Sequence, residues 1–177
     1  MMKFITLILF AILCSACAKD HHIPAANLRY TSVHIDEVGI MYRINYGSNM
    51  NLLDLYGRGM REGVASTLLN CALGEDKDFS VEHFIQFTAM GGVDVDASSH
   101  SGEKFNYSSH VFLEETDSHG SRAKMLSVKE LNSLLTGREY VPCKVIVTAY
   151  GFKPYYSNAL LIPAADLLRE INKPRSK

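Results

Sequence analysis

The chain has 177 residues, of which 47% are hydrophobic, and a formal net charge of −1. This length suffices for one domain with a buried core, and the nearly balanced charge offers no basic stripe for nucleic acid or anionic lipid. The sequence contains no tryptophan, which excludes an indole anchor at a membrane or a sugar platform.

The chain begins with a pattern typical of an export signal. Lys3 precedes an unbroken apolar run from Phe4 to Leu13, and the small residue Ala16 stands directly before Cys17. A positive start, a short apolar run and a small-residue cleavage site define a secretory signal peptide. The run is too short to span a membrane stably.

The end of this leader, Leu13-Cys14-Ser15-Ala16-Cys17, resembles the lipobox of bacterial lipoproteins. The resemblance implies that Cys17 becomes the mature N-terminus and carries acyl chains such as palmitate. Ala18 follows this cysteine, which in that family implies the periplasmic side of the outer membrane. Cys14 stands where the family usually has Leu or another apolar or small residue. Ordinary cleavage and release of a soluble periplasmic protein is therefore the alternative.

We divide the chain into three parts on this basis. Residues 1–16 form the signal peptide, residues 17–27 the lipidated cysteine and a short tether, and residues 28–177 a single domain. The tether is polar and is interrupted by Pro24, which favours an extended linker.

Two cysteines, Cys71 and Cys143, belong to the domain. An even pair in an oxidising compartment predicts a disulfide bond. Two buried free thiols are the alternative. A loop of this length is expected to stabilise the fold by about 4 kcal/mol when it is closed.

The first part of the domain predicts a hairpin followed by a long helix. Arg29–Ile35 and the alternating residues of Ile40–Tyr46 form two strands joined by a turn at Asp36–Gly39. Between Asn51 and Leu73, apolar residues recur at three- and four-residue steps, which predicts the main helix. Three glycines in this segment weaken the helix.

The middle of the domain predicts further strands and a short helix. Phe84–Ala97 is predicted as a second hairpin that turns at Gly91-Gly92. Phe105–Glu115 is predicted as one long strand. The capping box Ser127–Glu130 begins a short helix that ends at Gly137.

The last part predicts two strands and a terminal helix. The β-branched residues of Cys143–Tyr150 favour a strand near the sheet centre. Leu160–Ile162 is an edge strand, and Pro163 begins a C-terminal helix. This order favours the α+β class: a single domain with a mainly antiparallel sheet and helices packed on one face.

Two polar loops, Asp94–Glu103 and Thr116–Lys124, are the candidate binding surfaces. Loops on a rigid scaffold commonly carry recognition, and we expect both to protrude from one end of the sheet. The residues selected from them are Asp94, Asp96, His100, Glu103, Asp117 and His119.

The same loops contain the residues that come closest to a catalytic or metal-binding motif. Ser101, His100 and Asp96 can be assembled into a Ser-His-Asp set, but loops rich in these residues produce such sets by chance. The spacing of carboxylates and histidines fits neither a helical zinc motif nor a calcium loop. We therefore assign no catalytic residue, no cofactor and no metal ligand, and we expect the chain not to be an enzyme.

Three classes of function compete. A protein-binding module comes first, and in general architecture the chain resembles the small lipoproteins that serve as immunity proteins against secreted, periplasm-acting toxins. A structural or assembly lipoprotein of the outer membrane comes second, and a hydrolase that uses the His100 region third. The expected partners are a protein, with such a toxin as one candidate, and the membrane through the lipid anchor; nucleic acid is not expected.

Overall fold

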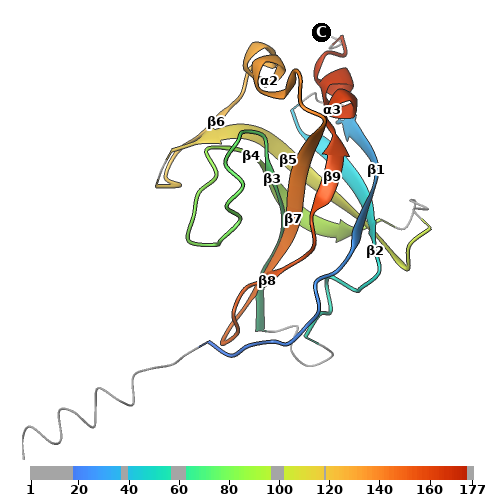
Figure 1. Cartoon of the computed structure of the whole chain (residues 1–177), viewed down its shortest axis with the longest axis vertical. Helices are drawn as coiled ribbons and strands as arrows, with labels where there is room; N and C mark the ends of the chain where they lie inside the picture. The colour runs from blue at the N-terminus through green and yellow to red at the C-terminus, as the bar shows by residue number, and fades with distance from the viewer. Residues whose placement is uncertain (1–17, 37–39, 57–62, 97–101, 118, 175–177) are drawn as a thin grey trace, which may run out of the picture.

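The computed structural model describes residues 18–36, 40–56, 63–96, 102–117 and 119–174 (Figure 1). Strands account for 46% of the described residues and helices for 12%. The elements are β1 (Leu28–Ile35), β2 (Tyr42–Ser48), β3 (Val64–Ala72), β4 (Phe87–Val95), β5 (Phe105–Thr116), β6 (Ala123–Met125), α2 (Val128–Leu135), β7 (Tyr140–Ala149), β8 (Tyr155–Tyr156), β9 (Leu160–Pro163) and α3 (Ala164–Ile171).

The strands form one sheet in the order β1-β2-β5-β4-β3-β7-β8, with β6 paired to β5 and β9 paired to β7. Every pairing between these named strands is antiparallel. The twelve-residue strand β5 pairs with β4 along most of its length, and with β2 and then β6 along its other edge. It is therefore the strand around which the sheet is built.

The sheet curls into a half-barrel, so that β1 and β9 come together at one side, below α3 (Figure 1). Two hydrogen bonds tie α3 to β1: the Tyr30 hydroxyl donates to Asp166 at 3.0 Å, and the Ile35 amide donates to Glu170 at 3.2 Å. The helix thus bridges two strands that stand far apart in the pairing order.

The main core fills the concave side of this curl. Tyr46 and Tyr107 lie with their ring centroids 6.0 Å apart, and both side chains are fully buried. Alternation along the strands sends one face of each inward, as period-2 apolar patterns do. Other members of this core are Val33, Ile44, Leu69, Val111, Leu113, Val145, Val147, Leu131, Leu135, Leu167 and Ile171.

The expected fold class, an α+β domain with helices packed on one face of the sheet, is wrong. The described part of the chain is mainly β, and its two short helices, α2 and α3, lie together at one end of the curled sheet (Figure 1). The main error is the expected helix over Asn51–Leu73, because its second half is strand β3. Residues 57–62 of that segment lie outside the described residues.

Tertiary pairing explains why Val64–Ala72 is a strand. It pairs with β4 on one edge and β7 on the other, and such non-local hydrogen bonding overrides a helical apolar period. Leu69 and Cys71 point into the core, whereas Leu68 and Asn70 line the opposite face. Because apolar residues lie on both faces of this strand, their spacing in the sequence matches the three- and four-residue steps of a helix face.

The turn expected at Gly91-Gly92 is also wrong, since both glycines lie inside the continuous strand β4. A Cβ atom at Gly91 would clash with the backbone carbonyl of His110 on β5. Glycine is required here because two strands approach closely, which is the other common reason for glycine within a strand.

Several elements confirm their predictions. The hairpin of β1 and β2, the long strand β5 and the edge strand β9 are present. Helix α2 has the expected capping box between Ser127 and Glu130. Helix α3 begins directly after Pro163. Strand β7 is also present, but it lies near one end of the pairing order and not at its centre.

The Cys71–Cys143 disulfide is confirmed. The two residues are register partners on β3 and β7, with their Cα atoms 3.9 Å apart. The bond therefore joins two neighbouring strands, whereas the sequence pattern predicts a helix at Cys71 and a strand at Cys143.

The segment Ala18–Asn27, interpreted from the sequence as a tether, lies against the domain from Lys19 onward. Ala26 is fully buried, its amide donates to the Tyr155 hydroxyl at 2.6 Å, and its carbonyl accepts from the Asn158 amide at 2.9 Å. The Tyr155 hydroxyl in turn donates to the Pro24 carbonyl at 3.2 Å. This segment is part of the folded unit.

Candidate functional site

The connection between β3 and β4 folds back over the convex face of the sheet. Its residues Phe79 and Ile85 are buried there against Ile146 of β7 and Ala72 of β3, forming a second, smaller core. The Val81 amide donates to the Tyr156 hydroxyl at 3.2 Å. In Figure 1 this connection is the green segment beside β3. The connection projects from the convex face of the sheet and forms a wall beside the exposed strands.

Polar contacts fix the shape of this wall. His83 and Asp76 form a hydrogen bond of 2.6 Å between Nε2 and Oδ2, and the Ser80 amide donates to Asp78 at 2.9 Å. The bond to Asp76 raises the pKa of His83 and lowers the pKa of Asp76. Acceptance of the Ser80 amide lowers the pKa of Asp78. These hydrogen bonds hold the connection between β3 and β4 in one conformation.

A groove of about 240 Å³ lies beside this wall. Side chains of β3, β4, β5 and β7 make its floor, and the β3–β4 connection makes one wall. The β5–β6 connection and Ala123 of β6 make the other wall. The lining residues include Leu68, Asn70, Val81, Phe84, Thr88, Met90, Glu114, Thr116, Gly120, Ala123 and Ile146. We call this feature the outer groove.

Five large apolar side chains stand exposed on or beside the outer groove, each between 39% and 47% exposed. Met90 and Phe112 are register partners on β4 and β5, so their side chains lie on the same face. We call the five residues, Val81, Phe84, Met90, Phe112 and Met125, the outer patch. Apolar side chains gathered on one exposed face mark interaction surfaces more often than scattered ones do.

Glu114 places one carboxyl group in this apolar surface. It lines the outer groove and is the register partner of Thr88 on β4 and of Met125 on β6. Burial raises its pKa, because removal from water disfavours the ionised form.

The two walls of the outer groove meet at Phe84. Gly120 of the β5–β6 connection has φ +67°, and a Cβ atom there would clash with the Phe84 ring. Glycine therefore serves two purposes at this position, a left-handed backbone and room for an aromatic ring.

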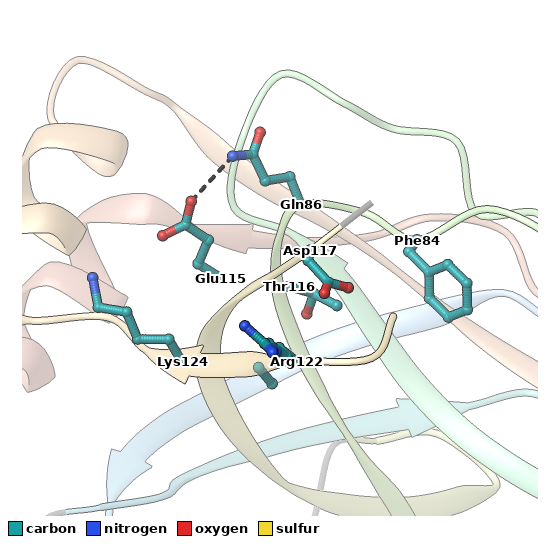
Figure 2. A pocket seen from close by; sticks show the side chains of 8 residues that line it. Phe84, Gln86, Glu115, Thr116, Asp117, Arg122 and Lys124 are labelled. Atoms are coloured by element: carbon teal, nitrogen blue, oxygen red, sulfur yellow. Dashed lines mark hydrogen bonds between the residues drawn. The ribbon is translucent and has the colours of Figure 1, made fainter. Parts of the chain in front are cut away.

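A second, open pocket of about 630 Å³ adjoins the outer groove and shares Phe84, Thr116 and Ala123 with it. Figure 2 shows the Gln86 amide turned toward the Glu115 carboxylate, to which it donates at 3.1 Å, with Phe84 on the other side of the pocket. Lys124 from β6 pairs with Glu130 of α2 at 2.9 Å. The apolar groove thus continues into a surface of mixed charge.

Of the predicted binding loops, Thr116–Lys124 borders this site. Asp117 accepts hydrogen bonds from the Ser121 amide at 2.8 Å and the His119 amide at 3.2 Å, which lower its pKa. Asp117 lines the open pocket, and His119 is exposed. The described residues of this loop form a hydrogen-bonded turn at the edge of the candidate site.

The other predicted loop, Asp94–Glu103, lies at the opposite end of β5. Val95 is paired with Tyr107 near the start of β5, whereas Phe87 is paired with Glu115 near its end. The two loops therefore leave the sheet at opposite ends and do not form one surface (Figure 1).

The residues selected from this second loop differ in their exposure. Asp94 is exposed, Glu103 is half-buried and Asp96 is buried. His100, with Ser101, lies outside the described residues.

Sequence reasoning missed the outer patch. The sequence pattern predicts Met90 beside a turn and predicts no helix or strand around Val81, so it assigns neither residue to a sheet face. The signal was present in part: if Phe87–Val95 is one strand, Thr88 and Met90 share a face that Ala89 and Val93 do not. The fold of the β3–β4 connection over that face had no such signal.

Within the described ranges, no three histidine, cysteine, aspartate or glutamate side chains gather so that they could hold a metal ion. None of the described helices is long and apolar enough to cross a membrane. No protein-family model, curated protein or solved structure matches the chain.

Proposed function

We propose that this chain is an exported, lipid-anchored protein-binding module that receives its partner in the outer groove. The observation that carries the proposal is the outer patch of five exposed apolar side chains. Val81, Phe84 and Met90 line the outer groove. Phe112 and Met125 lie beside it, as register partners of Met90 and Glu114. Methionine and aromatic residues are enriched at protein interfaces, and a polar rim around an apolar centre is their usual anatomy. The open pocket with Glu115, Asp117, Arg122 and Lys124 supplies such a rim.

The floor of the outer groove is well suited to binding because it is stiff. Leu68, Asn70 and Ile146 come from β3 and β7, the two strands that the Cys71–Cys143 disulfide joins. A surface that is already ordered loses little conformational entropy when a partner binds.

The anchor in this proposal is Cys17, on the periplasmic side of the outer membrane. A secreted toxin that acts in the periplasm is the partner that we place first, and the chain would then be an immunity protein. A structural or assembly role in the outer membrane is the alternative, and the identity of the captured partner distinguishes the two.

Photocross-linking in living cells tests the binding surface. A benzoylphenylalanine residue is placed at Phe84, Met90 or Phe112, and in matched controls at Leu161 of β9, which is 49% exposed, or Val95, which is 68% exposed. We expect one discrete adduct from the three patch positions and none from the controls. Equal adducts from all five positions, or none from the patch, would contradict the proposal.

Metabolic labelling tests the anchor separately. Radioactive palmitate should label the wild-type chain and should not label the Cys17→Ala variant. Labelling of neither protein would remove the anchor from the proposal and would favour the soluble periplasmic form, while the cross-linking result would stand by itself.

A further inference from the structure

The N-terminal segment is fastened to the tip of the hairpin formed by β7 and β8. The Lys19 amide donates to the Gly151 carbonyl at 2.8 Å, and the Lys19 carbonyl accepts from the Lys153 amide at 2.9 Å. These bonds form a parallel bridge between Lys19 and Phe152. Asp20 and Lys153 add an ion pair of 2.9 Å. The chain therefore has a fixed position on the domain from Lys19 onward.

Covalent geometry limits how far Cys17 can lie from this hairpin tip. It precedes Lys19 by two residues, and two residues of extended chain span at most about 7 Å. A lipid on Cys17 is thus attached within about 7 Å of a backbone position that the hairpin holds. The tip is consequently the part of the domain closest to any bilayer that receives this lipid.

The side chains at the tip have the chemistry of a membrane interface. Tyr150 is 78% exposed, more than any other exposed large hydrophobic residue that the structure describes. Phe152, two residues further along the tip, packs on Tyr56 with ring centroids 5.1 Å apart. Lys19 and Lys153 are both exposed at the same place. Tyrosine is enriched at the headgroup level of membranes, and lysine can interact with lipid phosphates there.

We propose that the β7–β8 hairpin tip, with Tyr150 at its end, is a second membrane contact that sets the orientation of the domain on the bilayer. This inference rests on the proposed anchor at Cys17. Helices α2 and α3 then face away from the membrane, since they lie at the opposite end of the molecule from β8 (Figure 1). The outer groove, on the convex face of the sheet, stays accessible from the side.

The absence of tryptophan from the sequence provides a direct test. Tyr150→Trp and Tyr140→Trp each introduce a single indole into the full chain, purified from membranes and reconstituted in phosphatidylethanolamine–phosphatidylglycerol vesicles. Tyr140 is a matched control because it is a 43% exposed tyrosine at the other end of β7, roughly 30 Å away at the rise of an extended strand. Emission is measured with and without brominated lipids, and the mass of the intact protein reports acylation of Cys17.

We expect Trp emission at position 150 to shift to shorter wavelength in vesicles and to lose more than half its intensity with brominated lipids. Emission from position 140 should change in neither way. An acylated protein whose position 150 is not quenched, or is quenched no more than position 140, would overturn the orientation and leave the anchor intact. An intact mass without acyl chains would overturn the anchor and the orientation together.

Discussion

Glu114 is a single residue whose ionisation couples stability to pH. Its folded-state pKa is raised by burial, so the folded protein binds this proton more tightly than the unfolded chain does. Ionisation therefore costs stability above the folded-state pKa, and this cost is absent below the ordinary pKa of a glutamate.

Glu114→Gln should accordingly stabilise the protein at pH 7, by less than about 1 kcal/mol because the carboxyl group keeps contact with water. The gain should disappear near pH 3, where the wild-type side chain is already neutral. Urea denaturation at the two pH values measures the difference. Glu115→Gln, at the next position of β5, is the matched control, and an equal gain from both variants would refute the argument from burial.

At the scale of elements, the sequence predicted a helix that depends on local signals and missed a strand that depends on long-range pairing. The capping box of α2 is contained in four consecutive residues, Ser127–Glu130, and the sequence was sufficient to locate it. Strand β3 depends on β4 and β7, which lie far from it in sequence. The residue pattern of Val64–Ala72 by itself contains no information about those partner strands. The same reason accounts for Gly91 of β4, whose close neighbour is the His110 backbone of β5.

Gly91 and Gly92 offer a matched pair of substitutions in β4. Gly91→Ala should destabilise the protein by about 1–3 kcal/mol, the usual cost of forcing extra volume into a packed site, because its Cβ atom would clash with the His110 carbonyl. Gly92→Ala should have little effect, since no atom lies within 4 Å of a Cβ atom there. Thermal unfolding of both variants measures the contrast. Equal stability of the two would show that β4 and β5 separate easily.

At the scale of the whole molecule, the sequence was sufficient for a predominantly antiparallel sheet but not for its curvature. The curl depends on contacts between segments at the two ends of the chain, such as Tyr30 with Asp166 and Ala26 with Tyr155. The sequence around each of these residues does not indicate which distant residue it contacts. The same limit explains why the sequence located the loop Thr116–Lys124 but not the groove beside it. Polar residues are enough to predict a loop, whereas the apolar groove forms only when distant segments come together in the fold.

The disulfide should contribute to the stability of the whole sheet. Cys71 and Cys143 are separated by 72 positions, and opening a loop of that size should cost about 4 kcal/mol in the chain-entropy model. The Cys71→Ala/Cys143→Ala double variant should therefore unfold at a much lower urea concentration than the wild type. A midpoint within error of the wild type would show that β3 and β7 stay together without the bond.

The packing of Pro24 and Ala26 against Tyr155 also has a consequence for how the protein is made. These contacts join positions 129 and 131 residues apart, and the pairing of β3 with β7 likewise joins distant parts of the chain. If the chain is exported with its N-terminus first, as we propose, the segment around Pro24 and Ala26 has no partner until the last quarter of the chain has followed. Such non-local contacts slow folding. Under that proposal the incomplete chain would stay unfolded during export, and the domain would close only after its C-terminal part had been delivered.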